Sequence, residues 1–136
     1  MGGWSAEREV SLRSGKACAD ALTRTGRYKV TPIDVTRDIA MTLRALKPDC
    51  ALNVLHGRPG EDGTLQGLLE ILGIPYSHSG VMASAVAMQK DIAKTVLKAA
   101  GVPVPGGVVV SRLEAAKEHL LPRPYVIKPV AEGSSV

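Results

Sequence analysis

Residues 56–67 hold most of the side chains that could do chemistry at short spacing. His56 is followed within six residues by two carboxylates, Glu61 and Asp62, and glycines separate these groups. Glycines in a turn let main-chain N–H groups approach an anion at the start of a helix. A loop with no functional role would also use glycines to turn the chain, and acidic residues to stabilise the N-terminus of the following helix. The spacing alone leaves both interpretations open.

The flanking residues indicate which elements position this stretch. Residues 50–55 form an apolar run that is short enough for a buried strand. Four leucines after the stretch share the spacing of one helix face: they are Leu65, Leu68, Leu69 and Leu72. The stretch therefore lies where a strand passes into a helix, which is where open α/β sheets bind ligands.

Two motifs resemble those of one enzyme family. The pattern His-Gly-x-x-Gly-Glu-Asp-Gly-x-Leu-Gln-Gly over residues 56–67 resembles the signature of the D-alanine–D-alanine ligases of the ATP-grasp superfamily. Residues 5–11, Ser-Ala-Glu-Arg-Glu-Val-Ser, resemble a second motif of that family and come in the right order. The resemblance implies ATP-dependent joining of two D-alanines through an acyl phosphate, for peptidoglycan precursor synthesis.

The resemblance also implies roles for individual residues. Glu7 is expected to be catalytic and to bind the amino group of the first D-alanine, and His56 to line the substrate crevice and steer the second. Ser134 is expected beside the reacting carboxyl group. The expected cofactor-binding residues are Lys90, Lys128, Glu132 and Ser135. Taken alone, Glu7 could instead compensate a helix dipole and Lys90 could be a solvated side chain. His78 departs from the small residue expected in the family and receives no role.

The implied cofactors are ATP and Mg²⁺ or Mn²⁺, with every metal ligand expected outside these residues. The chain is therefore expected to be a fragment that is inactive alone. The implied partners are D-alanine, ATP and a second copy in a homodimer. Two alternatives remain open: a non-catalytic binding or dimerisation module over residues 65–100, and a related ligase whose second substrate is D-lactate or D-serine.

Periodicity and turn residues predict an α/β fold. The resemblance makes this a layered, mostly parallel Rossmann-like domain over residues 1–79, with its first strand missing, and the first part of an ATP-grasp α+β domain over residues 80–136. Predicted strands cover residues 28–35, 50–55, 74–76, 108–110 and 125–129. The first predicted helix follows Ser5, which is its expected N-cap. Further helices are predicted over residues 39–46, 65–72 and 81–100, and a capping box at Ser111 and Glu114 predicts the start of a short last helix.

Composition narrows the possible partners. The net charge is +4, from 17 basic and 13 acidic residues that are scattered along the chain, and aromatic residues make up 3%. This pattern disfavours nucleic-acid binding. No apolar run is long enough to span a membrane and the start does not resemble a signal peptide, so a cytoplasmic location is expected. Cys18 and Cys50 are expected to be small buried side chains without a disulfide.

Overall fold

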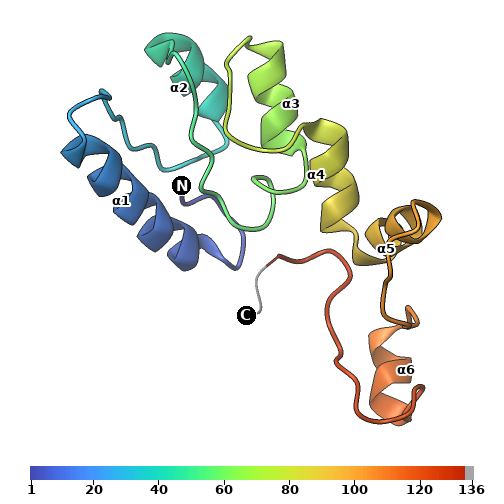
Figure 1. The fold of residues 1–136 in the computed structure, drawn as a ribbon. Helices are drawn as coiled ribbons and strands as arrows, with labels where there is room; N and C mark the ends of the chain where they lie inside the picture. The colour runs from blue at the N-terminus through green and yellow to red at the C-terminus, as the bar shows by residue number, and fades with distance from the viewer. Residues whose placement is uncertain (134–136) are drawn as a thin grey trace.

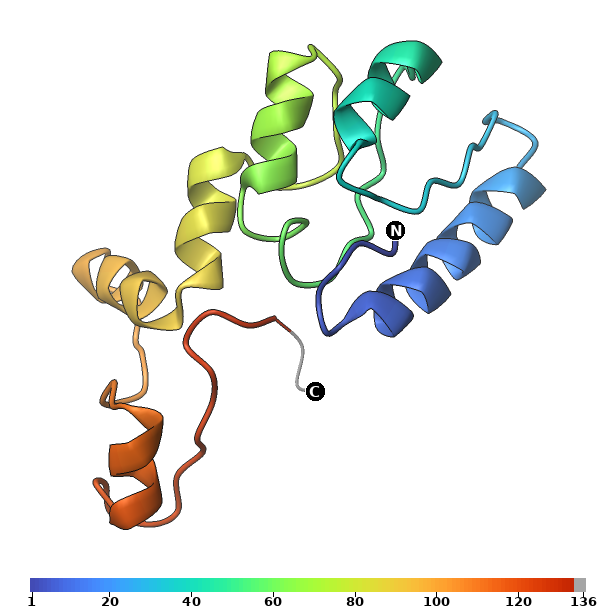
Figure 2. The same ribbon diagram turned by 180° about the vertical axis from the view of Figure 1, so that it is seen from behind.

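The computed structural model describes residues 1–133. Over these residues the chain forms six helices (Figure 1): α1 Arg8–Arg24, α2 Ile39–Leu46, α3 Thr64–Ile71, α4 Val81–Met88, α5 Lys90–Ala99 and α6 Arg112–Lys117. Helices α1 to α3 and their connections form one body, and α4 leads away from it to α5 and α6. Figure 2 shows that the segment after α6 then runs back toward the start of α1.

The predicted strands do not form regular strands in the described part of the chain. Two isolated parallel bridges are present, between Gly2 and Val35 and between Ala51 and Tyr76. In them the Val35 N–H donates to the Met1 carbonyl at 2.9 Å, and the Ala51 N–H donates to the Pro75 carbonyl at 2.8 Å. The pairing direction agrees with the predicted parallel arrangement, but each contact is too short to be a strand. The layered sheet expected over residues 1–79 is therefore reduced to two local pairings.

The two predicted strands of the second unit also fail to form regular strands. Their apolar side chains are exposed, with Val109 at 62% and Val126 at 78% of their full accessible area. A strand is stabilised by a main-chain partner and by a surface on which its side chains pack. Residues 108–110 and 125–129 have the strand-forming composition but lack that packing surface among the described residues.

A side chain of α1 joins two extended segments that a strand ladder would otherwise join. The Ser11 hydroxyl accepts a hydrogen bond from the Gly2 N–H at 2.9 Å and donates one to the Val54 carbonyl at 2.7 Å. Ser11 is fully buried. It is therefore a hydrogen-bonding spacer between residues 1–3 and the segment that leads into the glycine-rich stretch.

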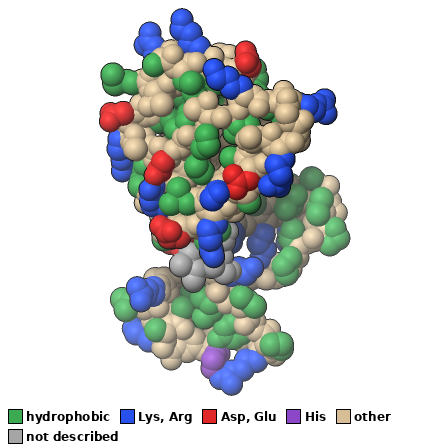
Figure 3. Space-filling view, turned by 90° about the vertical axis from the view of Figure 1, so that its left-hand side faces the viewer, with side chains coloured by type: hydrophobic (Ala, Val, Ile, Leu, Met, Phe, Trp, Pro, Cys, Tyr) green, Lys and Arg blue, Asp and Glu red, His purple; other side chains and the backbone are tan. Residues whose placement is uncertain are grey.

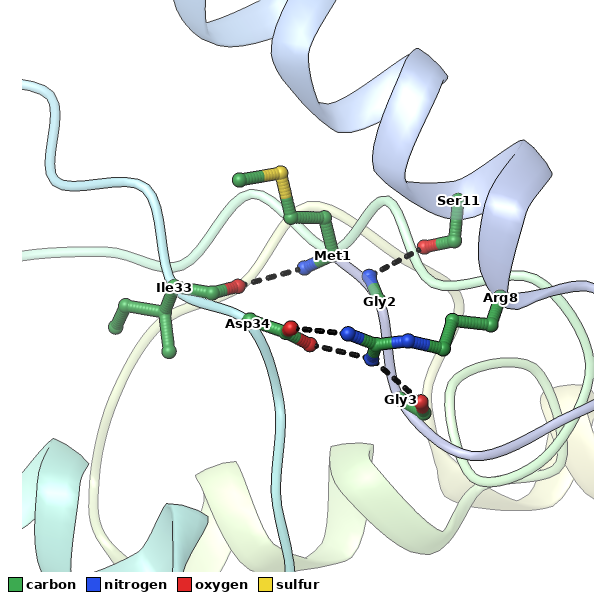
Figure 4. A network of polar contacts seen from close by, with 7 residues as sticks. All are labelled: Met1, Gly2, Gly3, Arg8, Ser11, Ile33 and Asp34. Atoms are coloured by element: carbon green, nitrogen blue, oxygen red, sulfur yellow. Dashed lines mark hydrogen bonds and ion pairs between the residues drawn. The ribbon is translucent and has the colours of Figure 1, made fainter.

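An ion pair fixes the start of α1 (Figure 4). The Arg8 guanidinium binds both carboxylate oxygens of Asp34, with Nη1 2.7 Å from Oδ1, and also donates to the Gly3 carbonyl at 2.8 Å. These hydrogen bonds hold the pKa of the Asp34 carboxyl below its usual value. Both side chains are partly exposed, so water screens the pair.

Two small residues of α1 face inward. They are Ser11 and Gly15, the buried residues of the helix. The helix lies so close to the first residues that a Cβ on Gly15 would be 2.3 Å from the Cβ of Met1. Small residues therefore face inward, because larger ones would not fit.

The apolar core lies mainly between α2, α3 and the extended segments beside them. Its buried members are Val35, Ile39, Leu43, Leu55, Leu65, Leu69 and Ile74. The expected burial of both cysteines is wrong: Cys50 is exposed and Cys18 is half-buried, and both are free thiols. The capping box at Ser111 and Glu114 is confirmed at the start of α6.

Candidate functional site

The glycine-rich stretch folds into a turn, residues 57–63, that its own polar groups close. The Gly57 carbonyl accepts hydrogen bonds from the N–H groups of Gly60 at 2.9 Å and Glu61 at 3.0 Å. In return, Glu61 Oε2 accepts from the Gly57 N–H at 2.6 Å. This reciprocal pairing fixes the backbone, and it uses one oxygen of Glu61 to do so.

The turn passes directly into α3. The Asp62 carboxylate accepts a hydrogen bond from the Thr64 N–H at 3.1 Å, at the helix start where negative charge is stabilising. Its other oxygen lies 3.3 Å from Arg58 Nε. Asp62 therefore stabilises both the start of the helix and the turn.

Glu7 lies against this turn, just before α1. It is only 4% exposed, and a Cβ on Gly57 would be 3.0 Å from Glu7 Oε1. Ser5 connects the two segments: its hydroxyl accepts from the Glu7 N–H at 3.2 Å and donates to the His56 carbonyl at 2.7 Å. The N-cap position of α1 is occupied by Glu7, so the prediction that Ser5 is the N-cap is wrong. Ser5 instead ties the start of α1 to the turn.

The end of the described chain reaches the same place. A Cβ on Gly133 would lie 2.5 Å from Glu61 Oε2 and 3.0 Å from Glu7 Oε1. Lys90, the first residue of α5, holds this returning segment: its N–H donates to the Val130 carbonyl at 3.0 Å, and its ammonium donates to the Glu132 carbonyl. Three regions far apart in sequence thus meet beside the glycine-rich turn.

A cavity of about 280 Å³ opens at this meeting point. Its wall includes charged groups from three elements, Glu61, Lys90 and Glu132, together with His78 and Ser84. Its volume is close to the lower limit for small-molecule sites in proteins, which is about 300 Å³. The charged wall suits a small polar ligand.

The remaining predicted site residues lie as follows. His56 is half-buried, and its carbonyl accepts the Ser5 hydrogen bond. Lys128 is exposed and is not part of the cavity wall. Ser134 and Ser135 lie outside the described residues. Glu61 and His78 line the cavity although no site role was predicted for either; for Glu61 the available signal was an acidic residue in a glycine-rich turn.

The described residues do not form a metal site. Over residues 1–133, no group of three or more His, Cys, Asp and Glu side chains is arranged to hold a metal ion. Figure 3 shows that Lys and Arg side chains on one face are dispersed among acidic and apolar ones. In the described part of the chain, no helix combines the length and apolarity that a membrane crossing requires.

Known proteins with similar sequences are D-alanine–D-alanine ligases. A family model described as the D-ala D-ala ligase N-terminus matches residues 40–79. A D-alanine–D-alanine ligase of Rhodopseudomonas palustris (strain BisB18) is 71% identical over all 136 residues of this chain, which cover 44% of that protein. Over its whole length the chain is similar to D-alanine–D-alanine ligases. The family resemblance predicted from the two motifs is thus confirmed, and the chain spans less than half the length of the curated relatives it matches.

Solved structures agree with this assignment. A D-alanine–D-alanine ligase from Bacillus anthracis matches the whole chain with a TM-score of 0.76 and 37% identity, over 45% of its own length. A structure of the Bacillus anthracis ligase complexed with ATP matches 78% of this chain and 37% of its own length, with a TM-score of 0.64 and 39% identity. The fold of this chain is therefore similar to the matching part of these solved ligases.

Proposed function

We propose that the complete protein joins two D-alanines at the expense of ATP, and that this chain supplies the substrate domain, residues 1–79, and the start of the ATP-grasp unit, residues 80–136. The convergence of Glu7, Glu61 and the segment ending at Gly133 beside one cavity carries this proposal. The product, D-alanyl-D-alanine, would enter peptidoglycan precursor synthesis.

The reaction needs a carboxylate oxygen to become a leaving group. The γ-phosphoryl group of ATP passes to the carboxylate of the first D-alanine, which gives an acyl phosphate and ADP. The neutral amine of the second D-alanine then attacks the acyl carbon, phosphate departs and the amine loses a proton. Such transfers depend mainly on positioning and on neutralising the charge of the phosphoryl group.

Residues of this chain suit the substrate side of that reaction. Glu7 is a buried carboxylate at the turn, and in the proposal it binds the ammonium group of the first D-alanine. A charge-assisted hydrogen bond in a buried site is strong enough to orient so small a substrate. His56 would steer the second D-alanine, and Ser134 would lie beside the reacting carboxyl group.

The nucleotide would meet the other wall of the cavity. Lys90 lines that wall, and its ammonium donates a hydrogen bond to the Glu132 carbonyl. In the proposal, the ammonium gives up this hydrogen bond and binds a phosphate oxygen instead. Lys128, Glu132 and Ser135 would complete the phosphate contacts. The Bacillus anthracis relative complexed with ATP supports ATP as the nucleotide.

Three further properties belong to the same proposal. The two parallel bridges support a layered, Rossmann-like arrangement of the first domain. Mg²⁺ or Mn²⁺ would be held by ligands outside this chain, and no step assigned to these residues depends on it. A cytoplasmic location is proposed because the expected substrates, ATP and D-alanine, are small cytoplasmic metabolites.

A second candidate, an association module, has one observation in its favour. Ile71 on α3 and Met82 on α4 are 84% and 80% exposed, although both are large and apolar. A contact surface between two copies of the chain would need exposed apolar residues of this kind. In the ligase they would support a homodimer; without catalysis they would leave a dimerisation module.

The deciding experiment uses the complete protein with ATP and D-alanine. We expect phosphate release that depends on D-alanine, together with D-alanyl-D-alanine detected by mass spectrometry. Parallel reactions with D-lactate or D-serine as the second substrate test the related ligases. Phosphate release without dipeptide, or an inert protein that nevertheless dimerises, would overturn the proposed reaction.

A further inference from the structure

A buried amide connects the glycine-rich turn to His78. Gln66, in the first turn of α3, is fully buried. Its Nε2 donates to the Gly60 carbonyl at 2.7 Å and lies 3.0 Å from His78 Nδ1. A carbonyl oxygen only accepts hydrogen bonds, so the NH₂ group of Gln66 must face Gly60. The orientation of the amide is therefore fixed.

This orientation determines the state of the His78 ring. The second Nε2 proton of Gln66 points to His78 Nδ1, so that nitrogen must accept, and the ring must be neutral with its proton on Nε2. The other neighbours of Nδ1 are oxygens: Ser84 Oγ at 3.3 Å and the Ser79 carbonyl at 3.4 Å. Ser84 is buried and already donates its proton to the Ser79 carbonyl at 3.0 Å. Gln66 is thus the donor that the neutral ring uses.

The position of the Gly60 carbonyl determines the geometry of the turn. Two side-chain amides hold it, Asn53 Nδ2 and Gln66 Nε2, each at 2.7 Å. The next residue is Glu61, whose carboxylate lines the cavity and closes the turn on Gly57. A shift of the Gln66 amide therefore shifts the backbone that carries Glu61.

We propose that His78 is a positioning residue of the ligase site: its unprotonated Nδ1 fixes the Gln66 amide, and through Gly60 it fixes the turn that carries Glu61. The catalytic part of this inference rests on the proposed function. Protonation of His78 would place an N–H against the N–H of Gln66, break that hydrogen bond and turn the ring toward Ser84 and Ser79. The charged groups that share the cavity wall with the ring are Glu61, Lys90 and Glu132.

The kinetic test uses three variants of the complete ligase. His78→Leu removes the acceptor, and we expect KM for D-alanine to rise about tenfold while kcat changes less than about twofold, because the hydrogen bond that fixes the Gln66 amide is lost. His78→Asn offers an oxygen in place of Nδ1 that does not titrate. It should restore KM at neutral pH, and its KM should not show the rise toward acid pH that we expect of the wild type. His119→Asn, on a histidine in the segment after α6, is the matched control and should leave both constants unchanged.

A double-mutant cycle with Gln66→Leu tests the route of the effect. If His78 acts through Gln66, the His78→Leu change adds little to the KM of the Gln66→Leu enzyme. Additive effects, an unchanged KM in His78→Leu, or a wild-type pH profile in His78→Asn would each overturn the inference.

A spectroscopic test separates this inference from the proposed reaction. Long-range ¹⁵N–¹H spectra of the histidine-labelled protein at neutral pH should show His78 with Nε2 protonated and Nδ1 bare. A proton on Nδ1 would overturn the inference even in an active ligase. A protein that makes no dipeptide would overturn the proposed function, while the bare Nδ1 would still support the contact with Gln66.

Discussion

Replacing Gly60 with alanine should destabilise the protein through one identifiable collision. The added Cβ would lie 2.1 Å from the Cβ of Leu55 and 3.2 Å from its Cα. Leu55 is a buried member of the core, so its side chain has no open space into which to move. The backbone at residue 60 is also held by the hydrogen bonds that its carbonyl accepts from Asn53 and Gln66. Overpacking of this kind costs about 1–3 kcal/mol.

The measurement is urea unfolding monitored by circular dichroism. With a dependence of about 2 kcal/mol per molar urea, a loss of 2 kcal/mol lowers the midpoint by about 1 M. Gly106→Ala is the matched control, because a Cβ there meets nothing within 4 Å and the backbone is not left-handed. That change should be neutral or stabilise by up to about 1 kcal/mol. Equal midpoints for the two variants would refute the reasoning about Leu55.

Three further outcomes are expected. Glu7→Gln in the complete enzyme should raise KM for the first D-alanine, and unchanged steady-state constants would remove Glu7 from the site. Ser11→Ala leaves two main-chain groups, one buried and one partly buried, without their partner and should cost about 1–3 kcal/mol in urea unfolding; an unchanged midpoint would contradict this. The Arg8 hydrogen bonds lower the pKa of Asp34 in the folded state, so the stabilisation is present above the unfolded pKa and is lost as pH falls through the folded one. Melting temperatures below about pH 4 should therefore fall less steeply in Asp34→Asn than in the wild type, and parallel curves would contradict the pairing.

The helices and the family could be predicted because their signals are local. The leucine spacing after Gly63 predicts α3, and the capping box at Ser111 predicts α6. The turn at residues 57–63 was predicted from its glycines, and it forms where predicted, between an extended segment and a helix. Each of these features depends on residues within a few positions of one another.

The strands and the contacts of Gln66 depend on residues that are distant in sequence. The composition of residues 28–35 and 50–55 is typical of strands, but each segment makes one bridge. A strand ladder needs a neighbouring segment, and no local sequence pattern shows whether that neighbour is present. The role of Gln66 was likewise invisible: its leucine-rich surroundings predict a helix face, and only the fold brings its amide to Gly60 and His78. Cys50 shows the converse error, since an apolar neighbourhood in sequence did not ensure burial.

Around this site, side chains make the connecting hydrogen bonds that main-chain groups make in a regular sheet. Ser11 joins Gly2 to the Val54 carbonyl, and the Asn53 and Gln66 amides both hold the Gly60 carbonyl. Main-chain hydrogen bonds survive most substitutions, whereas each of these contacts is removed by changing one side chain. The turn therefore takes its precise geometry from a few buried polar residues, and a substitution that disturbs one of them should alter substrate affinity and stability together.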